Sequence, residues 1–365
     1  MKKMIALFLC AAMCAASFTA CGSGEKQEEV PTEVQQEQTE QQDAPKQEEQ
    51  KETPEAQVSE NYPLTVTTYN YAKEKVDFTF EKAPEKVWVQ NQNNIEVMLA
   101  LGLGDKIVGA YGLDGEIRED LKDEFEKINY YDSMPTKEEI IALEPDCIIG
   151  WYSTFDDKRL GDVGFWHERG VGTYMSLNSA CRGPAAENPQ TINEECEDIL
   201  TIGKIFDVEE KAQALVDRIK GEVEKVNKHL EGKEKLTAAV LEDEGGTYRV
   251  YGEDTLGGNV AVNGGADLIV GKHGENGNIS AEDLIAANPD AIFMVWYDGY
   301  DVNDTEYNGE NVTKLITEDP KFASLDAVKN NRVFGINLSG IYCSGLRTLD
   351  GILDISTNLY PELYQ

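Results

Sequence analysis

The residues best suited to hold a ligand are aromatic side chains at the ends of predicted strands. The buried runs CIIGW and AIFMVW lead into the pairs Trp151-Tyr152 and Trp296-Tyr297, and the run KIVGAYG carries Tyr111 near its end. In open α/β sheets, ligands bind beyond the carboxyl ends of the strands. We therefore predict that the two Trp-Tyr pairs face each other across a cleft between two lobes, with Tyr111 in a similar position. The alternative for each tryptophan is burial in the core of its own lobe.

Two arginines could offset negative charge around such a cleft. Arg182 lies in the loop NSACRG after the predicted strand VGTYMSL, and Arg347 ends the segment YCSGLR, which begins with Tyr342. A planar guanidinium can bind oxygen anions in a bidentate manner. We predict that both arginines contact the ligand and that Tyr342 adds to the wall of the site. Arg347 has a structural alternative as a helix-start residue that bonds to nearby carbonyl groups.

Histidines and glycine-rich segments match neither a metal site nor an enzyme motif. His167, His229 and His273 lie in different segments, without the spacing of a shared metal ion. The segment GADLIVGKH has a histidine where a phosphate-binding loop needs Ser or Thr, and no G-x-S-x-G sequence is present. We expect no catalysis, no protein metal site and no resident cofactor. If the cargo were haem, Tyr152 or Tyr297 could serve as an axial ligand.

The charge balance argues against nucleic acid as a partner. The formal net charge of the chain is −35, of which residues 1–60 carry −7 and the remaining 305 residues carry −28. A nucleic-acid-binding protein needs a basic face, and a strongly negative field repels phosphate. An anionic ligand would therefore need a local cluster of basic residues.

The N-terminus predicts export and a lipid anchor. Lys2 and Lys3 precede an apolar run that is too short to span a membrane, so residues 1–20 are predicted to be a signal peptide. The run ends in FTACG, which resembles the lipobox of bacterial lipoproteins. The resemblance implies lipidation of Cys21 and a place on the extracytoplasmic face of the cell membrane. The alternative is an ordinary secretion signal with a soluble product.

Residues 21–60 are predicted to form a disordered tether. This stretch is rich in Glu and Gln and contains no aromatic residue and no hydrophobic periodicity, so it cannot bury a core. Repulsion between its acidic side chains should keep it extended.

The strands that carry the Trp-Tyr pairs belong to a segment that occurs twice. TKEEIIALEPDCIIGWY and SAEDLIAANPDAIFMVWY begin 144 residues apart. In each copy a helix is expected to be followed by a proline and a buried strand, which predicts two similar α/β lobes with mostly parallel, Rossmann-like sheets. The positions that recur are Glu138, Ile141, Ala142, Pro145, Asp146 and Ile148, matched by Glu282, Ile285, Ala286, Pro289, Asp290 and Ile292.

Capping signals define where these two helices begin. Thr136 with Glu139 fits a capping box, and Ser280 with Asp283 fits the same pattern in the second copy. In the first helix the apolar side is expected to include both Ile140 and Ile141.

A long helix is expected between the two copies. VEEKAQALVDRIKGEVEKVNKHLEG has apolar residues every three or four positions and no proline, and Asp207 with Glu210 is expected to cap it. A helix of about 23 residues would be roughly 35 Å long, enough to connect two lobes; a coiled-coil seam is the alternative. We predict an N-terminal lobe over 61–190, linking helices over 191–231 and a C-terminal lobe over 232–365.

These segments together carry a family resemblance. LALGLGDKIVGAY, the paired E-x-I-x-A-x-x-P-D motifs, IGKIFDVEEKAQALV and the ending GLRTLDGILDISTNLYPELY resemble the class III substrate-binding proteins of ABC importers. The resemblance implies two lobes joined by one long helix, a ligand held between them and slight closure on binding. It also implies delivery to a dimeric ABC permease driven by a cytoplasmic ATPase, and we expect the receptor to be a monomer.

The resemblance gives the two repeated glutamates a role. In the cobalamin-binding member, a glutamate on each lobe meets arginines of the permease, and Glu138 and Glu282 occupy those positions. Two carboxylates related by pseudo-two-fold symmetry suit a two-fold symmetric partner. The alternative is that acidic residues in a first helical turn only complement the helix dipole.

The ligand is expected to be an iron chelate, namely a ferric siderophore. The family uses arginines from such loops against carboxylate or catecholate oxygens, which is the role expected of Arg182 and Arg347. Trp151 matches an aromatic residue in the cleft of the cobalamin-binding member, so cobalamin or another corrinoid is one alternative and haem is another. A lipid-anchored sensor or adhesion module on the same fold is the alternative of a different class.

Overall fold

The computed structural model describes residues 61–180, 190–269, 277–297, 308–342 and 344–365. The predicted signal peptide, the lipid site Cys21, the tether and the predicted ligand contact Arg182 lie outside the described residues. Among the described residues, no helix is both long enough and apolar enough to cross a membrane.

The first lobe is built on a parallel sheet of four strands in the order β4-β3-β5-β6. An antiparallel hairpin, β1 and β2, packs beside β6. The strands are β1 (Leu64–Tyr69), β2 (Lys75–Phe80), β3 (Val87–Gln90), β4 (Ile107–Tyr111), β5 (Cys147–Gly150) and β6 (Gly172–Met175). The helices are α1 (Gln92–Ala100), α2 (Lys122–Phe125), α3 (Lys137–Ala142), α4 (Val163–His167) and α5 (Leu177–Ala180).

The second lobe has a six-stranded sheet in which β10-β8-β7-β11-β12 are neighbours and β9 also pairs with β7. β7, β9, β11 and β12 run parallel, β8 pairs antiparallel with β7, and β10 pairs antiparallel with β8 at the edge of the sheet. The strands are β7 (Thr237–Asp243), β8 (Tyr248–Val250), β9 (Asp267–Leu268), β10 (Asn278–Ile279), β11 (Ala291–Trp296) and β12 (Val333–Asn337). The helices are α8 (Leu256–Asn263), α9 (Ala281–Ala287), α10 (Gly309–Thr317), α11 (Asp326–Lys329) and α12 (Arg347–Leu359).

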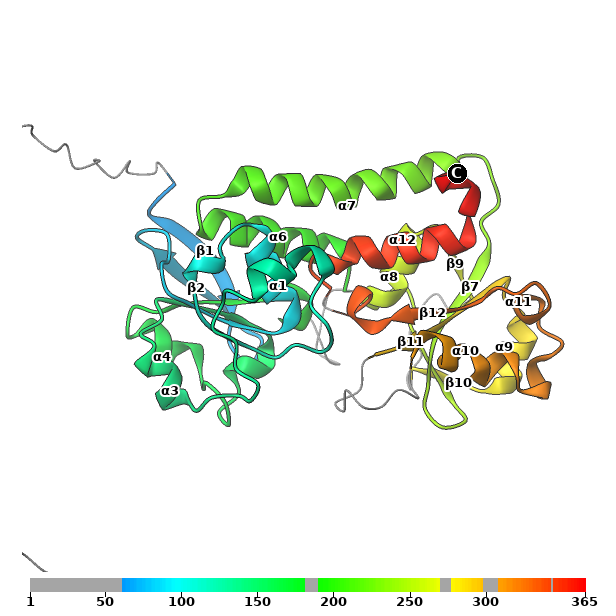
Figure 1. The fold of residues 1–365 in the computed structure, drawn as a ribbon, viewed down its shortest axis with the longest axis horizontal. Helices are drawn as coiled ribbons and strands as arrows, with labels where there is room; N and C mark the ends of the chain where they lie inside the picture. The colour runs from blue at the N-terminus through cyan, green and yellow to red at the C-terminus, as the bar shows by residue number, and fades with distance from the viewer. Residues whose placement is uncertain (1–60, 181–189, 270–276, 298–307, 343) are drawn as a thin grey trace, which may run out of the picture. The chain divides into compact units, whose positions relative to one another are not determined.

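Two helices join the lobes, α6 (Ile192–Ile205) and the long α7 (Glu209–Leu230). The 22 residues of α7 run beside α6 at one end and beside α12 of the second lobe at the other (Figure 1). Its apolar stripe explains why it stays in place, since Val216, Ile219 and Val226 are buried against these neighbours. The fold is thus the predicted α/β architecture of two lobes with mostly parallel sheets and one long connecting helix.

The predicted cap of the long helix is wrong. The N-cap residue is Val208, and Asp207 lies before it with a φ of 58° and bonds to Asn61. Asp207 therefore ends the turn after α6, because a residue in the left-handed region cannot occupy the extended conformation of a capping residue.

Both copies of the repeated segment begin with the predicted capping boxes. The Thr136 hydroxyl accepts from the Glu139 amide in α3, and Ser280 accepts from Asp283 in α9. The expected apolar side of α3 is only partly correct. Ile140 is buried, but Ile141 is 41% exposed because α3 ends one residue later and presents that position to solvent.

The Pro-Asp pair that recurs in the repeat has a structural reason. The Asp146 carboxylate accepts hydrogen bonds from the amides of Glu85 and Lys86, 2.9 Å each, just before β3. The Asp290 carboxylate accepts from the amide and the hydroxyl of Thr237, 2.8 Å each, at the start of β7. In both lobes the aspartate before one strand therefore aligns the beginning of its parallel neighbour.

We predict that Asp146→Ala or Asp290→Ala lowers the free energy of unfolding by about 1–3 kcal/mol, because each leaves two donors without their acceptor. Urea unfolding checks this. Asp132→Ala is the control, since Asp132 is an exposed carboxylate in the first lobe and its loss should change stability by less than about 0.5 kcal/mol. Equal unfolding midpoints for all three variants would contradict the proposed role of the pair.

Candidate functional site

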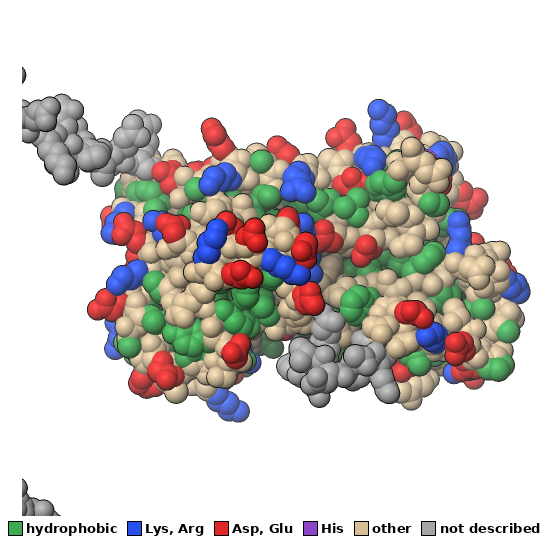
Figure 2. Space-filling view, in the orientation of Figure 1, with side chains coloured by type: hydrophobic (Ala, Val, Ile, Leu, Met, Phe, Trp, Pro, Cys, Tyr) green, Lys and Arg blue, Asp and Glu red, His purple; other side chains and the backbone are tan. Residues whose placement is uncertain are grey.

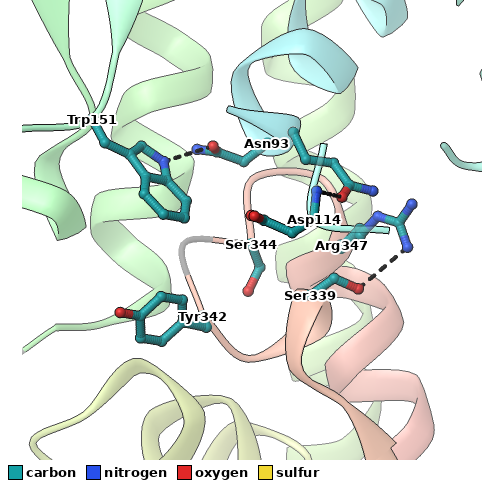
Figure 3. Close-up of a pocket in the computed structure, with 8 residues that line it drawn as sticks. Asn93, Asp114, Trp151, Ser339, Tyr342, Ser344 and Arg347 are labelled. Atoms are coloured by element: carbon teal, nitrogen blue, oxygen red, sulfur yellow. Dashed lines mark hydrogen bonds between the residues drawn. The ribbon is translucent and has the colours of Figure 1, made fainter. Parts of the chain in front are cut away.

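A small cavity, open to solvent, lies between the two lobes (Figure 3). Residues of both lobes line it, from the start of α1, the loop after β4 and the end of β5 on one side, and from the segment between β12 and α12 on the other. It therefore lies beyond the carboxyl ends of the strands, where α/β sheets bind ligands. The lining residues are Gln92, Asn93, Asp114, Trp151, Ser339, Tyr342, Ser344 and Arg347.

Two aromatic rings meet across this cavity. The centroids of the Trp151 and Tyr342 rings are 6.1 Å apart, with an angle of 72° between the planes, an edge-to-face arrangement (Figure 3). The indole N–H of Trp151 donates to Oδ1 of Asn93 at 2.8 Å, which fixes the orientation of the ring. The aromatic partner of Trp151 in the other lobe is thus Tyr342, whereas the sequence predicted Trp296.

A run of amide side chains positions Trp151. Asn91, with a φ of 75°, makes the sharp turn between β3 and α1, and its Oδ1 accepts from the Trp151 amide at 3.2 Å. Asn94 accepts from the Ser176 hydroxyl at 3.0 Å, just after β6. The run QNQNN, residues 90–94 at the end of a predicted strand, is the sequence signal for these residues.

Arg347 borders the cavity, but its guanidinium is occupied by protein groups. It binds the fully buried Glu96 carboxylate of α1 through Nε and Nη2, at 2.6 to 3.1 Å. Nη2 also donates to the carbonyl of Glu116 at 2.6 Å, and Nη1 lies 3.3 Å from Ser339 Oγ. The geometry favours the structural alternative, in which Arg347 holds the first turn of α12 against the first lobe. A direct contact with ligand stays a prediction.

A second ion pair crosses between the lobes beside the first. Arg118, before α2, contacts Asp350 of α12 and also binds Asp120 at 3.0 Å. Because Glu96–Arg347 and Arg118–Asp350 both end on the first turn of α12, they restrain the angle at which the second lobe meets the first.

Two buried carboxylates on α6 support the segments next to the cavity. Glu195 accepts from Asn178 at 2.6 Å and from the amide of Gly345 at 2.5 Å, so it links the first lobe to the segment before α12. Asp198 accepts from the Tyr174 hydroxyl at 2.8 Å and from the Leu177 amide at 3.0 Å. Burial, and then the nearby Glu195 carboxylate, raise the pKa of Asp198 well above its usual value.

This raised pKa makes a pH-dependent contribution to stability. A carboxyl group with a raised pKa in the folded state stabilises the fold below its unfolded pKa of about 4, and this contribution is lost as the pH rises through the folded value. We predict that Asp198→Asn, which keeps an acceptor for Tyr174, is more stable than the wild type at pH 8 by on the order of 1 kcal/mol, and that the difference shrinks at pH 4 to 5. Urea unfolding at both pH values measures it. A difference that is independent of pH would contradict the titration.

The other predicted aromatic contacts do not line the cavity. Tyr152 stacks on Tyr71 at 5.9 Å, and Tyr111 packs beside the apolar cluster around Trp88 in the first lobe. The indole of Trp296 lies so close to Gly309 of α10 that a Cβ there would be 2.9 Å from Nε1. Tyr297 is half-buried just after β11. The structure therefore brings together Trp151, Tyr342 and Arg347, and contact of the remaining rings with ligand stays a prediction.

The repeated glutamates lie on the surface of different lobes. Glu138 in the first turn of α3 and Glu282 in the first turn of α9 are both exposed. Within the described part of the chain, neither carboxylate has a hydrogen bond or an ion pair. Figure 1 shows α3 and α9 in different lobes, and both lie away from α7. On the face seen in Figure 2, Lys and Arg side chains lie among Asp and Glu side chains.

Comparison with known proteins agrees with this architecture. A family model described as periplasmic binding protein matches residues 87–337. The Bacillus subtilis ABC transporter substrate-binding lipoprotein YvrC, itself uncharacterized, is 25% identical over 303 residues, which is 79% of this chain and 84% of YvrC. The petrobactin-binding protein YclQ of the same organism is 23% identical and covers 81% of this chain and 86% of its own.

A solved structure of a periplasmic binding protein from Veillonella parvula is also similar. It superposes with a TM-score of 0.74 at 30% identity, and the match covers 83% of this chain and 93% of that one. An ABC-type Fe³⁺-hydroxamate transport protein from Saccharomonospora viridis shares the fold at a TM-score of 0.60 and 21% identity, over 82% of this chain and 99% of its own. This chain belongs to the periplasmic binding protein family, with the class III fold of the substrate-binding proteins of ABC importers.

Proposed function

We propose that this substrate-binding protein captures a ferric chelate between its lobes and delivers it to an ABC permease. The observation that supports this most directly is the cavity between the lobes with Trp151 and Tyr342 on its two sides. One ligand can contact the rings of Trp151 and Tyr342 at the same time, so binding depends on the relative position of the two lobes.

The polar groups around the cavity suit a ligand with oxygen donors and partial negative charge. Gln92 and Asn93 are the first residues of α1, and a helix N-terminus favours negative charge. Ser339 and Ser344 add hydroxyl groups to the wall. Arg347 is already paired with Glu96, so it does not offset the charge of Asp114, and the described lining offers the ligand hydrogen-bonding groups rather than one strong cation.

The relatives support iron as the cargo. YclQ is named a petrobactin-binding protein, and the solved structure from Saccharomonospora viridis belongs to a transport system for Fe³⁺-hydroxamate. Petrobactin and hydroxamates are different chelators, so binding experiments with several classes of chelate identify the ligand.

Tryptophan fluorescence of the purified protein tests the proposal. Trp88, Trp166 and Trp296 remain in a variant that lacks Trp151, so energy transfer to a bound, absorbing chelate still reports binding in that variant. We expect one class among ferric catecholates, ferric hydroxamates, haemin and cyanocobalamin to bind with micromolar or tighter affinity. Trp151→Ala should weaken binding about 10- to 100-fold, because it removes an aromatic contact at the centre of the site.

The matched comparison is Trp296→Phe, which changes a ring outside the cavity lining, so we expect an affinity within about two-fold of the wild type. A loss as large as that of Trp151→Ala would instead support the ligand contact that the sequence predicts for Trp296. If only haemin or only cyanocobalamin binds, the protein has the same import role with a different cargo. Equal affinity of Trp151→Ala and the wild type for every ligand would contradict the proposed site.

We also propose that a lipid on Cys21 anchors the protein outside the cytoplasm and that Glu138 and Glu282 dock the permease. The similarity to a substrate-binding lipoprotein supports the first part. The exposed, matching positions of the two carboxylates support the second.

A further inference from the structure

The turn between β1 and β2, residues Asn70–Glu74, lies at the ligand-binding edge of the first lobe; we refer to it as the hairpin tip. The hydroxyl of Thr68, near the end of β1, accepts from the amide of Met175 at 3.0 Å. Met175 is the last residue of β6. The hairpin tip therefore extends beyond the carboxyl end of β6, the edge at which this fold holds its ligand.

Hydrogen bonds hold the hairpin tip in one conformation. The Asn70 side chain donates to the Glu74 carboxylate at 2.8 Å and accepts from the Glu74 amide at 2.9 Å. The Lys73 amide donates to the carbonyl of Asn70 at 2.9 Å, and Lys73 has a φ of 67°. Glycine is the ordinary residue for that backbone conformation, so a lysine there indicates a use for its side chain.

The hairpin tip adds an aromatic and a cationic group next to the cavity. Tyr71 stacks on Tyr152 with ring centroids 5.9 Å apart and 21° between the planes, yet it stays 43% exposed. The Lys73 ammonium lies 5.2 Å from the centroid of the Tyr152 ring. The Tyr71 hydroxyl bonds to the Asp156 carboxylate, whose charge is offset by the nearby Lys158 and Arg159. Tyr152 directly follows Trp151 of the cavity wall, so the Cα atoms of these two residues are about 3.8 Å apart. The Tyr71–Tyr152 pair is therefore close in the chain to the aromatic wall of the cavity.

We propose that Tyr71, Lys73 and Tyr152 form a second contact surface for the ligand, which selects chelates with anionic aromatic arms. This rests on the proposed function. A flat ring stacks on the exposed Tyr71–Tyr152 pair, and the Lys73 ammonium attracts the negative charge of the arm.

The chemistry of the contact surface distinguishes two classes of ferric chelate. A ferric tris-catecholate has aromatic arms and carries net negative charge, so it can use both the rings and the ammonium. A ferric tris-hydroxamate such as ferrioxamine B has an aliphatic ligand and no net negative charge from its iron centre. The contact surface therefore favours catecholate over hydroxamate chelates.

Lys73→Gly gives the sharpest test, because glycine is compatible with the φ of 67° and should not destabilise the turn. Equilibrium dialysis of the full-length protein with radioactive iron, as ferric enterobactin or ferrioxamine B, measures both affinities. We expect Lys73→Gly and Tyr71→Leu each to weaken ferric enterobactin binding about 5- to 10-fold while ferrioxamine B binding changes less than two-fold. Lys75→Gln, which removes an exposed cation two residues away, is the control and should leave both affinities unchanged.

The outcomes separate this inference from the proposed function. If the wild type binds a ferric chelate but both variants keep the wild-type affinity for ferric enterobactin, the hairpin-tip inference is wrong and the proposed function stands. Tighter binding of ferrioxamine B than of ferric enterobactin also overturns the inference alone. If neither ferric enterobactin nor ferrioxamine B binds but another ferric chelate does, the inference alone is overturned; if no ferric chelate binds, the inference and the ferric cargo are both overturned. Thermal unfolding of each variant shows whether a loss of affinity reflects a loss of fold.

Discussion

Replacing Glu138 and Glu282 together by alanine should reduce ATP-driven uptake to background, while the affinity of the protein for its ligand stays within two-fold of the wild type. Both side chains are exposed, both lie in the first turn of the repeated helices, and neither lines the cavity. Loss of charge-pair contacts at an interface typically costs 2–5 kcal/mol for each buried pair. Two such losses would weaken docking by several orders of magnitude.

The neighbouring residues provide a matched control. Glu139 and Asp283 lie one position further along and accept hydrogen bonds from the capping residues Thr136 and Ser280. Glu139→Ala with Asp283→Ala removes the same number of charges from the same helix turns and costs the caps about 0.5–2 kcal/mol each. This control should remain folded and should support uptake.

Uptake of the radioactive ligand by cells or proteoliposomes that contain the permease and ATPase measures the effect, and equilibrium dialysis measures affinity. Wild-type uptake by the Glu138→Ala, Glu282→Ala variant would refute docking through these carboxylates. A fall in affinity in the same variant would mean that the two residues act on the cleft instead.

Much of the fold could be predicted because its signals are local or repeated. Thr136 and Ser280 each begin a helix through a capping box, and the aspartate after each helix aligns the beginning of a parallel neighbouring strand. The repeated segment predicts two similar lobes, even though one copy alone would be a weak signal for the fold. The cap at Asp207 failed because the tight turn between α6 and α7 puts that residue at a φ of 58°, a tertiary constraint that a capping pattern does not contain.

The site was less accessible from sequence because its geometry depends on contacts between distant segments. The position of Trp151 at the end of a strand correctly predicted that it lines the cavity. The ring opposite it is Tyr342, which comes from a loop after β12. Trp296 ends an equivalent strand, yet the close approach of Gly309 places it against α10. The repeated segment predicted that Trp151 and Trp296 occupy equivalent positions in the site. The segments that follow β5 and β11 differ, so the two tryptophans are not equivalent in the structure.

Arg347 illustrates the same limit. A guanidinium near a cleft in an acidic protein suggests a ligand contact, and only the structure shows the buried Glu96 that occupies it from 251 residues away. We expect that Arg347→Met lowers the free energy of unfolding by about 3–5 kcal/mol, because it leaves the Glu96 carboxylate buried without its partner. Arg118→Met removes an arginine whose partners Asp120 and Asp350 are more exposed, and it should cost less, about 1 kcal/mol.

A double variant separates the structural role of Arg347 from a contact with ligand. Glu96→Met together with Arg347→Met replaces both charges by apolar side chains of similar length, so it should recover at least half of the stability that Arg347→Met loses. If the guanidinium serves only to join α12 to α1, the double variant should also recover the affinity for the ligand, as judged by equilibrium dialysis. If stability returns but affinity stays at least 10-fold below the wild type, Arg347 contacts the ligand directly and the original prediction from the sequence is correct. If Arg347→Met unfolds at the same urea concentration as the wild type, the Glu96–Arg347 pair does not hold the two lobes, and their relative position must depend on the other links, namely Arg118–Asp350, the Glu195 bond to the Gly345 amide and the apolar stripe of α7.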